Sequence, residues 1–264
     1  MFFIANHPIY NHPLPEGHRF PMLKYELLPK QLLHEGTAEC TDFYSPDSID
    51  LSLVHAVHTV SYVKALTELT LDAKAVRSIG FPLSAALVER ELRIAQGTVV
   101  GCNHALENGI AFNIAGGTHH AFSDRGEAFC LLNDQAIAAQ YLINQKKCHK
   151  ILIVDLDVHQ GNGTAEIFQN NADVITFSMH GQSNYPFRKE TSDYDIALPD
   201  KTDDTTYLSI LQETLPELLN IHRPDFVFYL AGVDILGTDK LGKLGCTLEG
   251  CKTRDSYVLG LCKS

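Results

Sequence analysis

The sequence lacks the features that mark nucleic-acid-binding and membrane proteins. Its 21 Lys and Arg are outnumbered by 32 Asp and Glu, which gives a net charge of −11, and no long Lys/Arg-rich run offsets this locally. A direct nucleic-acid partner is therefore not expected. The longest apolar stretches, such as residues 151–156, fall far short of the roughly 20 residues that a membrane-spanning helix needs. A membrane partner is not expected either.

Closely spaced cysteine pairs, repeats and linkers are also missing. The seven cysteines are scattered without a CxxC pair, which excludes a zinc knuckle or a dithiol redox motif and favours a reducing, cytoplasmic location. No internal repeat, low-complexity block or Pro/Gly/Ser-rich linker interrupts the 264 residues, of which 45% are hydrophobic. These properties predict one globular domain over residues 1–264.

Strand-like and helix-like segments alternate along the chain. The helical spacing of apolar residues predicts helices over 21–33, 54–71, 84–107, 133–143 and 205–219. Short apolar runs predict strands over 2–5, 110–114, 151–156, 174–177 and 225–230. The run 151–156 is rich in β-branched residues, as in a strand that is covered on both faces. The pattern predicts a three-layer α/β domain whose mostly parallel central sheet is flanked by helices.

Polar residues follow the predicted strands at the edge where such sheets bind ligands, beyond the carboxyl ends. Asp155, Asp157 and His159 alternate at one strand end, so an extended backbone places them on one side. With Asp234, which follows another strand, they can supply the mixed oxygen and nitrogen ligands of a catalytic zinc site with an open position. The alternative is a polar strand end with capping aspartates.

His119 and His120 form an adjacent pair after Gly116 and Gly117, which allow a sharp turn. Near a metal-bound water, neutral imidazoles can act as general base and general acid. The alternative is a turn histidine beside a surface histidine. Ser178 follows the strand predicted over 174–177 and reaches the same edge, although a structural role explains it equally well. Phe129 precedes the helix predicted from 133 and fits the core, and Tyr185 fits either the core or the wall of a narrow channel.

Four motifs in order resemble the zinc-dependent histone deacetylases and their bacterial relatives. The motifs are Gly116-Gly117-Thr118-His119-His120-Ala121, Phe129-Cys130-Leu131-Leu132-Asn133-Asp134, Val154-Asp155-Leu156-Asp157-Val158-His159-Gln160-Gly161-Asn162-Gly163 and Ala231-Gly232-Val233-Asp234. The resemblance covers nearly the whole chain, and Gln160 with Asn162 makes it most similar to the class IV branch. It implies an arginase/deacetylase-type fold and hydrolysis of an acyl-lysine peptide or a small N-acyl amide.

The resemblance also implies roles for individual residues. Asp157, His159 and Asp234 would bind Zn²⁺, with Fe²⁺ as an alternative, while His119 and His120 would move protons. From the same motifs, Asp155 would hold His119 and Asn162 would face His120. The acyl-lysine tunnel would be lined by Phe129, Ala128 and Tyr185. A K⁺ site would be formed by Asp155, Asp157, His159 and Ser178.

Two departures from the family pattern stand out. Ala128 replaces a glycine that is usual before the Phe-Cys pair. The chain also stops at Ser264, before the last strand and the glycine-rich turn whose tyrosine binds the substrate oxyanion. We therefore expect a domain truncated at its C-terminus, with an uncovered sheet edge that favours a homo-oligomer and with impaired turnover. Tyr257 sits within a helical pattern over 247–261 and is predicted to serve packing.

Two other functions fit parts of the sequence. A zinc-binding protein that has lost turnover would keep the metal ligands and bind acyl ligands or act as a scaffold. An arginase-type ureohydrolase shares the α/β plan, but its two-metal site needs a further bridging carboxylate that these motifs do not supply.

Overall fold

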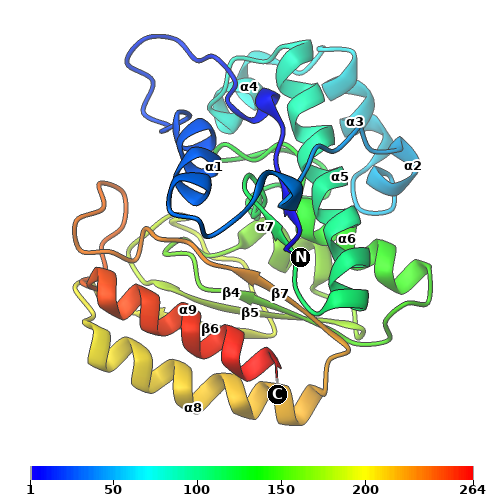
Figure 1. Ribbon diagram of the computed structural model, residues 1–264. Helices are drawn as coiled ribbons and strands as arrows, with labels where there is room; N and C mark the ends of the chain where they lie inside the picture. The colour runs from blue at the N-terminus through cyan, green and yellow to red at the C-terminus, as the bar shows by residue number, and fades with distance from the viewer. Residues whose placement is uncertain (1, 264) are drawn as a thin grey trace. The chain divides into compact units, whose positions relative to one another are not determined.

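The computed structural model describes residues 2–263, and its contacts divide the chain into two compact units. We call them the N-terminal unit (Met1–Asn144) and the C-terminal unit (Gln145–Ser264). Each contains a sheet of parallel strands together with helices, and Figure 1 labels the strands of the C-terminal unit. The predicted α/β class with parallel strands is thus confirmed, whereas the single domain over residues 1–264 stays a prediction.

The N-terminal unit is mainly helical. Its short parallel strands lie in the order β2-β1-β3, with β1 at Ile4–Ala5, β2 at Phe43–Tyr44 and β3 at Phe112–Asn113. The helices are α1 (Lys24–His34), α2 (Leu51–Val54), α3 (Val60–Thr67), α4 (Ala73–Ile79), α5 (Ala85–Asn108) and α6 (Asp134–Asn144), with 3-10 turns η1 (Pro8–Tyr10) and η2 (Cys40–Asp42). Helix α5 packs against α6, α3, β1 and β3 and so forms the centre of this unit.

Local capping explains where the helices begin and end. The Ser84 hydroxyl accepts a hydrogen bond from Leu87 N at the start of α5, and Gly109, at φ 93°, ends it. The continuous helix predicted over 54–71 is wrong in its bounds, because α2 ends at Val54 and only α3, which Thr59 caps, lies within that range. Pro29 lies inside α1 and does not divide it.

The C-terminal unit is built on a sheet of parallel strands in the order β6-β5-β4-β7. Its strands are β4 (Ile151–Asp155), β5 (Val174–Gly181), β6 (Tyr194–Leu198) and β7 (Phe226–Leu230), and its helices are α7 (Asn162–Phe168), α8 (Asp204–His222) and α9 (Leu248–Lys263). Every residue of β4 is buried, as its continuous apolar run predicts. Strand β6, with its alternating exposure, was not predicted.

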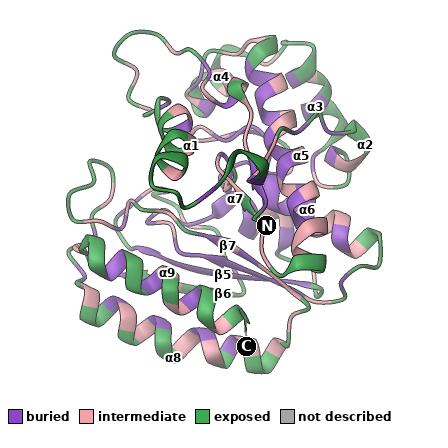
Figure 2. Ribbon diagram, viewed as in Figure 1, coloured by how far each residue is buried: buried purple, intermediate pink, exposed green. Residues whose placement is uncertain are grey.

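The two faces of this sheet carry different side chains. Helices α8 and α9 lie side by side on one face (Figure 1), where their apolar residues form a core with Leu152, Val154 and Phe177. Buried and exposed residues alternate along both helices accordingly (Figure 2). Tyr257 packs against this core, which confirms its predicted role. Among the helices described, none combines the length and apolar character needed to cross a membrane.

Candidate metal centre

Strands β4 and β7 run together until their carboxyl ends, where Asp155 pairs with Leu230. The turns that follow them are held by backbone N–H groups that donate to carboxylates. Asp157 N donates to Asp155 Oδ1 at 3.1 Å, and His159 N donates to Asp157 Oδ1 at 2.8 Å. Val158 N donates across to Asp234 Oδ1 at 3.1 Å. These bonds fix the two turns to each other at the edge predicted to bind ligands.

The structure brings Asp157, His159 and Asp234 together at this edge. Each offers one ligand atom, and these atoms lie within 4.8 Å of one another. His159 Nδ1 is 2.9 Å from Asp157 Oδ1 and 3.1 Å from Asp234 Oδ2. All three residues are half-buried, so the group remains accessible while it is partly removed from water.

The electrostatics of this group favour a cation. Burial raises the pKa of Asp234, and the neighbouring Asp157 carboxylate raises it further. Burial also disfavours a charged His159, but the two carboxylates outweigh it and raise the pKa of this imidazole to about 10. Two carboxylate oxygens and one imidazole nitrogen form a donor set that fits Zn²⁺ or Fe²⁺ and leaves positions for water and substrate.

Gly232 permits the close approach of the two turns. A Cβ atom at this residue would lie 2.5 Å from Asp157 Oδ2 and 2.7 Å from Asp157 Cα. Any side chain here would collide with the backbone of Asp157, one of the three candidate ligands. The motif Ala231-Gly232-Val233-Asp234 therefore has a steric reason for its glycine.

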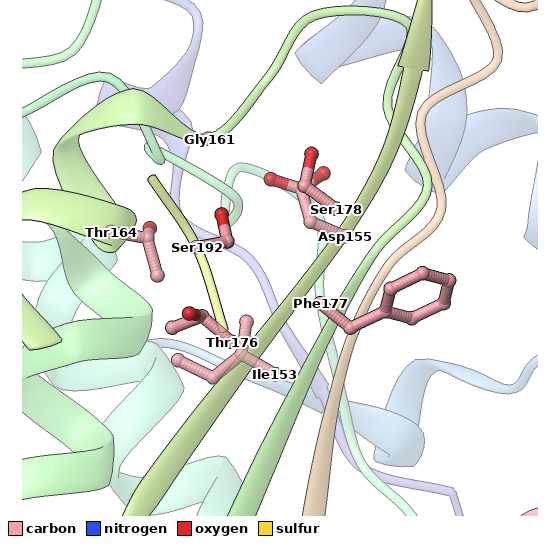
Figure 3. Close-up of a pocket in the computed structure, with 8 residues that line it drawn as sticks. All are labelled: Ile153, Asp155, Gly161, Thr164, Thr176, Phe177, Ser178 and Ser192. Carbon is pink, nitrogen blue, oxygen red and sulfur yellow. The ribbon is translucent and has the colours of Figure 1, made fainter. Parts of the chain in front are cut away.

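A small polar cavity lies beside the end of β4, on the face of the sheet opposite α8 and α9. It has a volume of about 10 Å³ and is lined by Asp155, Ser178, Thr164, Thr176, Ser192, Ile153, Gly161 and Phe177. Figure 3 shows Asp155 and Ser178 close together, while the Phe177 ring points to the other side of the strands. The volume suits a single water-sized occupant, and Ser178 Oγ also lies 3.0 Å from His180 Nδ1.

The remaining predicted residues of the C-terminal unit lie in the segments that follow β4 and β5. Asn162 is buried at the first position of α7, and its N–H donates to Gln160 O at 2.8 Å. Gln160 is itself fixed by Glu190 and Asp195, to which its amide donates at 2.7 and 2.8 Å. Tyr185 is half-buried in the loop between β5 and β6, and a cis peptide bond joins it to Pro186.

In the N-terminal unit, His119 and His120 are both buried, each with 5% exposure. Their ring centroids lie 4.1 Å apart at an interplanar angle of 45°. The turn that carries them needs its glycines, because Gly117 has φ 90° and a Cβ at Gly116 would lie 2.9 Å from Asp134 Oδ2. The His pair is thus a buried feature of the fold, and the alternative with one surface histidine is wrong.

Asp134 anchors this turn, a role that the sequence did not reveal. The carboxylate accepts hydrogen bonds from Gly117 N at 3.0 Å and from Thr118 N at 2.8 Å. The Thr98 hydroxyl of α5 donates to its other oxygen at 2.6 Å. Asp134 therefore ties the His-bearing turn to α5 and to the start of α6.

His58 is a second anchor that was missed. Its Nδ1 lies 2.8 Å from Phe122 O, and its Nε2 lies 3.0 Å from Asn133 N. These contacts require a neutral imidazole that donates from Nδ1 and accepts at Nε2. Burial lowers the pKa of His58 to about 4, which keeps the ring neutral at physiological pH.

Ala128 and Phe129 adopt left-handed backbone conformations, with φ 44° and 70°. The glycine expected at position 128 would adopt this conformation without strain. Here Ala128 N donates to Ser78 O at 3.0 Å and Phe129 N donates to Ile79 O at 2.6 Å, so the end of α4 holds the turn. The Phe129 ring lies against Phe20 and Phe81 at centroid distances of 5.0 and 5.1 Å, with the Arg19 guanidinium 4.9 Å from its centroid.

Parallel strands that end in a mixed carboxylate and imidazole group define an α/β protein with a candidate metal centre. The chain belongs to the histone deacetylase domain family, whose model matches residues 18–264. It is 48% identical over 261 residues to an uncharacterized protein of Picosynechococcus sp., covering 99% of this chain and 87% of that one.

More distant relatives agree with this assignment. Histone deacetylase 2 of Arabidopsis thaliana is 29% identical over 252 residues, which cover 91% of this chain but only 65% of that protein. The crystal structure of an HDAC homologue complexed with SAHA superposes with a TM-score of 0.88 at 22% identity, covering 100% of this chain and 77% of that one. The latter likeness supports the arginase/deacetylase-type fold that the motifs predicted.

Proposed function

We propose that this chain hydrolyses an N-acyl amide of the acyl-lysine kind and uses a divalent metal ion held by Asp157, His159 and Asp234. Water adds to the acyl carbon, the C–N bond breaks, and a carboxylate and a free amine are formed. The observation that carries the proposal is the group of three ligand atoms at the ends of β4 and β7. Family membership supports the same reaction class.

The donor set makes zinc the first candidate and Fe²⁺ the second. When bound, the ion lowers the pKa of water and polarises the amide carbonyl. Asp155 and Ser178, which line the small polar cavity, support a K⁺ site that also uses carbonyl oxygens of Asp155, Asp157 and His159. A monovalent cation there would compensate part of the negative charge of these turns.

The chain's own residues supply the remaining steps. On the family motif, His119 and His120 move the protons: one ring nitrogen accepts the proton of the attacking water, and another delivers a proton to the leaving amine. By resemblance to the same motifs, we assign Asp155 to hold the ring of His119 and Asn162 to face the ring of His120. Phe129, Ala128 and Tyr185 are proposed to enclose the acyl-lysine chain, since an aromatic wall excludes water from its methylene groups.

The relatives point to the substrate class. One is named histone deacetylase 2, and one solved HDAC homologue is complexed with SAHA. A protein-borne acyl-lysine and a small N-acyl amide both end in the same reacting group. Because the reacting group is the same, the experiment uses acetyl-lysine and trifluoroacetyl-lysine peptides as substrates. Each carries a fluorophore that is released after deacylation.

The test uses the purified chain loaded with Zn²⁺. We expect turnover that is abolished in His120→Ala and retained in His34→Ala, whose exposed histidine at the end of α1 serves as the matched control. Zinc binding by the chain without hydrolysis of either peptide would contradict the proposal and favour a protein that only binds acyl ligands. Two tightly bound metal equivalents would favour the arginase-type reaction instead.

A further inference from the structure

Arg254 lies on α9 and is one of the most deeply buried side chains described, with 0% exposure. A buried guanidinium is costly unless its donors are satisfied. Its Nε and Nη2 atoms each lie 2.8 Å from Asp255 Oδ1, and Asp255 also accepts a hydrogen bond from Tyr229 OH at 2.5 Å. These contacts balance the charge, but they leave Nη1 directed elsewhere.

Nη1 donates to two backbone carbonyls that flank the candidate metal centre. It lies 3.2 Å from Leu156 O and 2.7 Å from Gly232 O. Leu156 directly precedes Asp157, and Gly232 lies two residues before Asp234. One atom of α9 thus contacts both turns that supply the metal ligands.

This link lies where the sheet can no longer hold the turns together. The β4–β7 pairing ends at Asp155 and Leu230, with one further bond from Leu156 N to Leu230 O at 3.2 Å. Beyond it, the Gly232 backbone packs directly on the Asp157 side chain. A change in the position of Gly232 would therefore be transmitted to Asp157 by steric contact.

We infer that Arg254 is a positioning residue for the metal centre and sets the spacing between the Asp157 turn and the Asp234 turn. The inference rests on the proposed function, because it takes these turns as the source of the metal ligands. Lysine keeps the charge but has no rigid fork of donors, so it cannot hold both carbonyls and Asp255 at once. Residues that hold metal ligands typically contribute 10–100-fold to metal affinity.

The experiment measures Zn²⁺ affinity of the full chain by competition with a chromophoric chelator, together with the visible spectrum of the Co²⁺-loaded protein. For Arg254→Lys we expect affinity about 10–100-fold weaker and an altered Co²⁺ spectrum. Arg90→Lys is the matched control, because Arg90 is also buried and bonds to Glu91 and to Tyr10 O within the N-terminal unit. It should lower the melting temperature while zinc affinity and the Co²⁺ spectrum remain those of the unmodified chain.

Asp255→Asn separates positioning from charge pairing. It weakens the ion pair of Arg254 but keeps the carbonyl contacts, so zinc affinity should remain within a few-fold of the unmodified value. Equal loss of affinity in Asp255→Asn and Arg254→Lys, or unchanged affinity in Arg254→Lys, would overturn the inference. Arg254→Gln replaces Arg254→Lys if the latter does not fold. If the unmodified chain fails to bind zinc, the proposed function fails with the inference; if it binds zinc, only the inference is at stake.

Discussion

The two units hold their proposed site residues by different means. In the C-terminal unit, Asp157 and His159 follow the buried strand β4 and Asp234 follows the partly buried strand β7, and backbone N–H groups orient the carboxylates. In the N-terminal unit, β3 has only two residues, and buried polar side chains hold the turn with His119 and His120. The candidate metal centre depends on backbone pairing and N–H donation, with Arg254 as an added side-chain contact, whereas the turn with His119 and His120 depends on buried side chains such as Asp134. The two should therefore respond differently to substitution.

The largest expected effect is the loss of zinc binding in Asp157→Ala. The substitution removes a ligand, and removal of even a supporting residue typically costs 10–100-fold in affinity. We expect a loss greater than about 100-fold, measured by chelator competition. Asp173→Ala, an exposed aspartate of the same unit, should bind zinc normally. Normal zinc affinity in Asp157→Ala would show that the ligands lie elsewhere.

Asp134→Ala tests the contrasting dependence on side chains. It leaves the N–H groups of Gly117 and Thr118 without their acceptor and removes the nearer of two acceptors of the Thr98 hydroxyl. At about 1–3 kcal/mol for each buried group, we expect a loss of about 3–5 kcal/mol in unfolding free energy, measured by urea denaturation. Zinc affinity should not change, because the proposed ligands come from the other unit. A parallel loss of zinc affinity would remove the distinction between the units.

The neutral state of His58 predicts how stability depends on pH. Its pKa is about 4 in the folded protein and near 6.5 in the unfolded chain, so between these values the unfolded chain binds more protons. Stability should fall by about 3 kcal/mol as the pH drops from 6.5 to 4, at about 1.4 kcal/mol per pH unit. His58→Gln should lack this contribution, seen as a flatter plot of unfolding free energy against pH. An unchanged slope in the variant would refute the assignment.

Gly232→Ala should have the smallest effect on stability, while still reaching the metal centre. The added Cβ collides with Asp157, and we expect a loss of about 1–3 kcal/mol together with weaker zinc binding. Gly260→Ala is the matched control on α9, since nothing lies within 4 Å of a Cβ there. It should stabilise the protein by about 0.5–1 kcal/mol through helix propensity. Identical melting curves for the two variants would contradict the close approach at Gly232.

The sequence predicted the candidate metal centre better than it predicted the distant side chains that hold the site turns in place. A continuous apolar run with β-branched residues is a local pattern, and the polar residues at its end are adjacent in sequence, so β4 and the Asp157 turn could be recognised. The side chains that hold the turns cannot be recognised in this way, because their partners are distant in sequence. His58 contacts a backbone group 75 residues away, and Arg254 contacts one 98 residues away. Nothing local to either residue indicates such a partner, although a lone arginine among the apolar positions of a predicted helix is a signal to examine.

Short and edge elements were the other weakness. Strand β3 is shorter than its apolar run suggested, and β6 shows only an alternating pattern that a few residues cannot distinguish from a loop. The break between α2 and α3 depends on Thr59, whose hydroxyl accepts a hydrogen bond from Tyr62 N. The helical spacing of apolar residues continues across Thr59, so the sequence pattern does not reveal that one helix ends and another begins there.

The left-handed turn at Ala128 and Phe129 affects how the shape of the proposed acyl-lysine tunnel could change between related sequences. Phe129 does not owe its orientation to its own backbone preference, since that conformation is unfavourable for a residue with a Cβ. Its ring is held by Phe20 and Phe81, which lie far from it in the sequence. Substitution at either of those positions would therefore reshape the proposed substrate wall without altering any residue of the recognised motifs, so substrate preference could drift while the motifs stayed the same.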